Sequence, residues 1–114
     1  MAITEAFAGS EAVSTTEWSL TTDSAGPDVE TSDGVFQIFL DVSDIVLGDE
    51  LQIRVYEKAQ AADTQRIVYQ ATLIDAQANP IWVSPSLILM NGWDVTLDAI
   101  AGTITVTWSI RKVA

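Results

Sequence analysis

TITVTWSI, the sequence at Thr103–Ile110, alternates almost without a break between small polar and large apolar residues. Ile104, Val106, Trp108 and Ile110 fall on one side of this pattern, and the threonines and the serine fall on the other. A period of two residues is typical of a β-strand with one buried face, because successive side chains of a strand point to opposite faces. The segment therefore predicts a half-buried strand.

Three further segments show the same period. Val35–Val42 (VFQIFLDV) places four apolar side chains on one face and Phe39 on the other, so we expect that strand to be covered on both sides. The polar link AQAADTQ joins the other two segments and predicts a hairpin. These two segments are Leu51–Lys58, with Leu51, Ile53 and Val55 inward, and Arg66–Leu73, with Ile67, Tyr69, Ala71 and Leu73 inward.

Shorter strands complete the pattern, and pairs such as Asp33-Gly34 and Asn91-Gly92 predict turns between them. About eight short strands without a sustained helical period predict an all-β fold, an antiparallel β-sandwich that is jelly-roll-like or immunoglobulin-like. We expect Trp18, Trp93 and Trp108 to anchor its core. The shorter strands are expected at Glu17–Thr22, Ile81–Val83, Leu87–Met90 and Trp93–Leu97.

The length of 114 residues fits one domain. Residues 1–14 are small, polar and weakly patterned, so we expect a flexible N-terminal arm that orders only against a neighbour. Residues 15–114 are expected to form the single β-sandwich domain. The first residues carry Glu5 and Glu11 in place of the basic residues of a secretory signal, which favours synthesis and use in a cytosol.

The charge is the most informative bulk property. Sixteen acidic and five basic residues give a net charge of −11, which disfavours nucleic acids and anionic membranes as partners. Eleven of the acidic residues precede Arg54 and no basic residue does, whereas five of each sign stand from Arg54 onward. Two interpretations remain open: the acidic residues keep the surface soluble, or they form an acidic outer face beside a neutral contact surface.

The composition offers few candidate catalytic residues. The chain has no histidine and no cysteine, which removes the commonest general base, the usual partner of a nucleophilic serine and the thiolate zinc sites. We therefore expect no enzyme and no cofactor. Asp28, Glu30 and Asp33 precede a glycine and loosely resemble a calcium loop, but their spacing departs from the EF-hand pattern, so a solvated acidic turn is the favoured interpretation.

Two segments are candidates for contacts with other proteins. Ile81, Trp82 and Val83 lie between two prolines that exclude a regular central strand, which predicts an edge segment displaying an aromatic anchor. The adjacent apolar run adds Leu87 and Ile88 to this expected interface. At the end of the chain, Arg111 and Lys112 are candidates for a head-to-tail contact with the acidic half of another copy, or simply form a soluble terminus.

Several stretches, spread over nearly the whole chain, resemble small uncharacterised proteins from the structural-gene region of tailed bacteriophages. They are Thr16–Thr21 (TEWSLT), Thr31–Gln37 (TSDGVFQ), Arg54–Lys58 (RVYEK), Pro80–Pro85 (PIWVSP), Gly92–Leu97 (GWDVTL) and Trp108–Val113 (WSIRKV).

The resemblance implies a virion structural protein, made in the host cytoplasm. Small acidic β-sandwiches of this kind are typically capsid decoration, or cement, proteins, which form homotrimers on the major capsid protein lattice at the capsid exterior. The resemblance thus implies the major capsid protein and further copies of the chain as partners. Two alternatives stay open: a tail, neck or adaptor subunit, and a carbohydrate-binding attachment module that stacks sugars on Trp82 and Tyr56.

Overall fold

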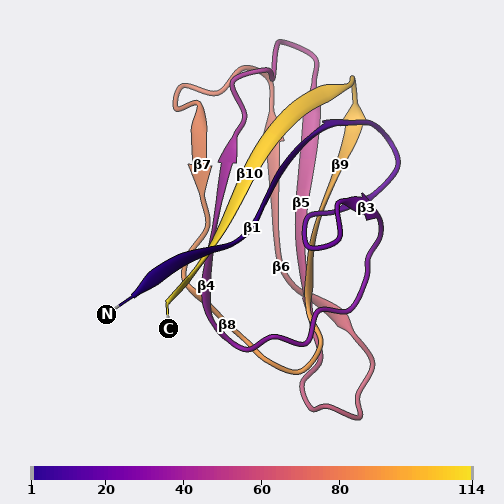
Figure 1. Cartoon of the computed structure of the whole chain (residues 1–114). Coiled ribbons are helices and arrows are strands. Elements are labelled where there is room, and N and C mark those ends of the chain that lie inside the picture. Colours follow the sequence, from indigo (N-terminus) through magenta and orange to yellow (C-terminus); the bar gives the residue numbers. More distant parts are fainter. Residues whose placement is uncertain (1, 114) are drawn as a thin grey trace.

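The computed structural model describes residues 2–113, which form ten β-strands and no helix. All strand pairs are antiparallel, and the strands form two five-stranded sheets that pack face to face (Figure 1). The predicted antiparallel β-sandwich is therefore confirmed. The strands are β1 (Ile3–Val13), β2 (Trp18–Ser19), β3 (Ser24–Ala25), β4 (Gly34–Asp41), β5 (Glu50–Glu57), β6 (Arg66–Ile74), β7 (Ile81–Val83), β8 (Leu87–Leu89), β9 (Asp94–Ala101) and β10 (Ile104–Val113).

The chain passes repeatedly between the two sheets. Sheet A has the strand order β1-β10-β4-β7, and β8 also pairs with β4. Sheet B has the order β3-β2-β9-β5-β6. The start of β1 and the end of β10 lie at one end of the sandwich, and the loop that joins β4 to β5 lies at the opposite end (Figure 1). None of the described residues belongs to a helix that could cross a membrane.

The core follows from the period of two. The inward residues of β10 predicted from the sequence, from Ile104 to Ile110, are all buried. Leu51, Ile53 and Val55 on β5 oppose them from sheet B and are buried as predicted. Trp93 and Trp108 are also buried, whereas Trp18 is half-buried and packs against the margin of the core. Burying each such side chain contributes about 1.5–3 kcal/mol, which accounts for the cohesion of the two sheets.

The prediction of a flexible arm over residues 1–14 is wrong for Ile3–Val13. These residues form the eleven-residue strand β1, which pairs along nearly the whole of β10. Phe7 projects from β1 to the ring of Trp93, with centroids 5.8 Å apart, and Val13 is buried. The small residues between them suit a strand that lies close to its neighbour, so the segment orders against its own domain.

The inward face of β6 also departs from the sequence prediction at one residue. Tyr69, Ala71 and Leu73 are half-buried against the core as expected, but Ile67 is exposed. The cause is an irregularity in the pairing of β5 with β6, where Val55 faces Tyr69 and the next residue, Tyr56, faces Ile67. The extra residue of this bulge turns Ile67 to the other face.

Candidate protein-binding surface

The outward face of sheet A is unusually apolar, because a row of aliphatic side chains crosses four of its strands. Ile3 on β1 pairs with Val113 on β10, Val113 pairs with Val35 on β4, and Val35 pairs with Ile88 on β8. Directly paired residues of antiparallel strands point to the same side of a sheet. All four side chains therefore face away from the core, and Ile88 is 79% exposed.

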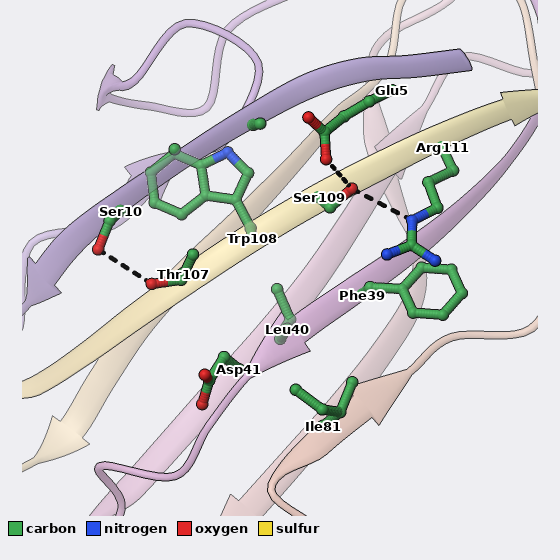
Figure 2. Close-up of a pocket in the computed structure, with 12 residues that line it drawn as sticks. Glu5, Ser10, Phe39, Leu40, Asp41, Ile81, Thr107, Trp108, Ser109 and Arg111 are labelled. Carbon is green, nitrogen blue, oxygen red and sulfur yellow. Dashed lines mark hydrogen bonds between the residues drawn. The ribbon is translucent and has the colours of Figure 1, made fainter.

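An aromatic–cation stack marks the middle of the same face. The guanidinium carbon of Arg111 lies 3.7 Å from the ring centroid of Phe39. The Arg111 Nε–H donates a hydrogen bond to Ser109 Oγ, and the Ser109 hydroxyl donates to Glu5, as Figure 2 shows. These contacts hold the guanidinium over the ring. Such a stack contributes about 0.5–1 kcal/mol at an exposed site and presents a broad, ordered contact surface.

Two concave regions lie on either side of this stack, and Phe39 and Arg111 border both. The larger one, which we call the groove, has a volume of about 680 Å³ and runs across β1, β10, β4 and β7 (Figure 2). The smaller one, the hollow, has a volume of about 180 Å³ and is walled chiefly by Ile3, Val35 and Val113. The outward face of sheet A therefore offers a partner two apolar recesses around one cation.

The outward face of sheet B is polar and internally paired. Arg54 on β5 bonds to Asp98 at 2.8 Å and lies 3.6 Å from Glu17. Glu17 also accepts hydrogen bonds from the hydroxyls of Tyr56 and Thr96. Burial, reinforced by the bond to Glu17, raises the pKa of Tyr56 to about 12. These polar groups already satisfy one another, so they offer a partner few free donors or acceptors. The exposed aliphatic side chains of this face include Ile67 and Ile74 on the edge strand β6.

A buried carboxylate fixes the loop beside this polar face. Asp94 accepts hydrogen bonds from the hydroxyls of Ser19 and Thr21 and from the backbone N–H groups of Asp28 and Val95. Burial raises its pKa, although the four hydrogen bonds act in the opposite direction. Because all of its neighbours here are hydrogen-bond donors from its own chain, we assign Asp94 a structural role.

The seven residues expected at an interface separate by face. Ile81, Val83, Ile88 and Arg111 all belong to the outward face of sheet A. Trp82 pairs with Leu40, a core residue, and is half-buried against the core, so the expectation that it is displayed is wrong.

Leu87 and Lys112 also differ from that expectation. Both pair with Phe36, which faces the core. Leu87 packs against the core, and the Lys112 ammonium lies 5.8 Å from the centroid of the Phe36 ring. The geometry therefore assigns these two side chains to the inner side of sheet A.

Other candidate groups are dispersed. Asp28, Glu30 and Asp33 do not gather, and residues 2–113 contain no group of three acidic side chains that could hold a metal ion. Glu30 instead accepts hydrogen bonds from the backbone N–H groups that follow it. Trp82 and Tyr56, the pair considered for stacking sugars, belong to different sheets, so they form no common platform.

The sequence pattern did not single out Ile3, Val35 and Val113 as surface residues, because alternation alone does not show which face of a strand the second sheet covers. It did signal Phe39, which breaks the alternation of its strand. No known family model matches the chain, and no curated protein matches it.

Proposed function

We propose that this chain is a non-catalytic structural subunit that binds other proteins with the outward face of sheet A. The observation that carries the proposal is the contrast between the two outward faces. Sheet A presents a four-strand aliphatic row and two apolar recesses, whereas the polar groups of sheet B are bonded to one another. Contiguous exposed apolar surface is characteristic of protein-binding sites.

The assembly that we propose is the head of a tailed bacteriophage, where the chain decorates the outer surface of the major capsid protein lattice and stabilises it. The support is the similarity of six segments to small phage structural proteins, together with the acidic composition and the absence of cysteine and histidine. A domain that docks on a lattice gains stability from subunit contacts as well as from its own core. The net charge of −11 favours proteins over nucleic acid or membrane as partners.

The first test is the number of copies in purified virions, measured by quantitative mass spectrometry against the major capsid protein. We expect a copy number comparable to that of the capsid subunit. A handful of copies per particle would contradict decoration and place the chain in the tail, the neck or an adaptor. Absence from the particle would refute the virion role.

The second test separates the two faces. Ile81→Asp introduces a carboxylate beside the groove, at a residue that is 48% exposed. Ile67→Asp makes the same change on sheet B, at a residue that is 46% exposed, and serves as the matched control. We expect Ile81→Asp to lower occupancy on capsids at least about tenfold, because a buried unpaired charge is costly at an interface, and Ile67→Asp to leave it unchanged. Equal occupancy of the two variants would refute the assignment of the face.

A further inference from the structure

The loop between β4 and β5, residues 42–49, presents a large apolar side chain on an ordered turn. Leu47 is 84% exposed at its tip. Asp49 closes the turn in both directions, because its N–H donates to the Val46 carbonyl and its carboxylate accepts from the Val46 N–H. A bond of 2.8 Å from the Gly48 N–H to Asp75 ties the loop to the end of β6. Little conformational entropy is therefore lost when Leu47 is buried by a partner.

The charge on this loop has one sign. Asp44 and Asp49 flank Leu47, and the loop contains no basic residue. Both carboxylates also accept hydrogen bonds from backbone N–H groups of the domain, which fixes their positions. A partner site for Leu47 must therefore combine an apolar recess with positive charge.

The hollow on sheet A has this combination. Its aliphatic walls come from Ile3, Val35 and Val113, Arg111 borders it, and no acidic side chain of the described residues lines it. Arg111 is therefore the positive charge that the hollow presents to a partner. The hollow therefore offers apolar walls for the side chain of Leu47 and a positive charge for the carboxylates on either side of it.

One copy cannot fill its own hollow. The loop leaves the end of β4 at Asp41, whereas the hollow lies at the start of β4 beside Val35. At about 3.4 Å per residue, the eight residues of β4 separate its ends by roughly 24 Å. In Figure 1 the β4–β5 loop and the start of β4 likewise lie at opposite ends of the sandwich. The hollow can receive Leu47 only from a second copy.

We propose that copies of this chain associate head to tail, with Leu47 of one copy seated in the hollow of the next and its flanking carboxylates facing Arg111. The contact uses different surfaces on its two sides, so it is heterologous and closes into a ring when the rotation between copies permits. A ring of three copies would be the homotrimer that the resemblance to capsid decoration proteins implies, and in that respect the inference rests on the proposed function.

The test uses purified protein and three variants. Leu47→Asp removes the apolar tip, Ile3→Asp adds a carboxylate to the wall of the hollow at a residue that is 66% exposed, and Ile67→Asp is the control on sheet B. Sedimentation velocity is recorded over a concentration series. We expect the wild type and Ile67→Asp to exceed the monomer mass of 12.3 kDa, and Leu47→Asp and Ile3→Asp to raise the dissociation constant about tenfold or more.

Mixing the two defective variants provides the decisive measurement. Leu47→Asp retains an intact hollow and Ile3→Asp retains an intact tip, so one sound contact can form between them. We expect the mixture to form dimers, twice the mass of 12.3 kDa, and nothing larger. A wild type that stays monomeric throughout, or a mixture that stays monomeric, overturns the proposal. If wild type then still decorates virions in high copy number, the head-to-tail contact fails while the proposed function stands.

Discussion

Gly9→Ala tests whether β1 is an integral part of sheet A. Gly9 faces Trp108 in the register of β1 and β10. A Cβ at residue 9 would lie 2.5 Å from Cζ2 and 2.9 Å from Cε2 of the Trp108 ring. Carbon atoms that are not bonded prefer about 3.5–4.0 Å, so the ring or the strand must move by about 1 Å.

The geometry indicates that β1, and not the Trp108 ring, moves to relieve this clash. Trp108 is buried, and its indole N–H donates a hydrogen bond of 3.1 Å to the Leu20 carbonyl, so the ring has little room. β1 is an edge strand of sheet A and is the part free to shift. Overpacking costs about 1–3 kcal/mol, and the better strand propensity of alanine returns about 0.5–1 kcal/mol. We expect a net loss of about 1–2 kcal/mol, which lowers Tm by about 4–16 °C.

Urea denaturation followed by tryptophan fluorescence measures this loss. Ala8→Ser is the matched control, because Ala8 adjoins Gly9 and points out to solvent on the other face; it should change stability by less than about 0.5 kcal/mol. A Gly9→Ala variant as stable as wild type would refute the reasoning. It would mean that Gly9 does not pack on Trp108 and that residues 1–14 are the separate arm expected from the sequence.

Three further outcomes are expected. Trp82→Ala should cost about 2–3 kcal/mol in urea denaturation, because its half-buried ring packs on the core; unchanged stability with weakened assembly would instead make Trp82 a contact residue. Asp94→Asn should cost about 1–3 kcal/mol in free energy of unfolding. Both carboxylate oxygens of Asp94 accept hydrogen bonds, and the NH2 group of asparagine would replace one of these acceptors with a donor that faces another donor. Unchanged stability would contradict this bonding. Burial raises the pKa of Asp94 and of Asp98, so the native state takes up these protons at higher pH than the unfolded state does. Tm should therefore rise as the pH falls from about 7 toward those raised values, in a chain with no histidine to titrate, and a falling Tm would refute the sign.

Strands with strict alternation were predictable because their period, their apolar residues and the flanking turn residues all indicate the same strand. β10, β5 and β4 lie within two or three residues of their expected bounds. β1 was missed for a physical reason. Its residues are small and its apolar side chains few, so its stability as a strand comes from pairing with β10, about 100 residues further along the chain. A preference that arises from a distant partner leaves little trace in the local sequence.

The prediction that Trp82 is displayed was wrong for a different reason, which the period of two explains. The sequence indicated that Ile81–Val83 and its neighbours form an exposed edge, but a strand divides such a segment between two faces. The register settles the division: Trp82 faces the same side as Leu40, in the core, so Ile81 and Val83 face outward with Phe39. Alternation alone gives only the relative orientation of neighbours. The absolute orientation depends on which side the second sheet covers, and here that sheet leaves the aliphatic residues around Arg111 exposed.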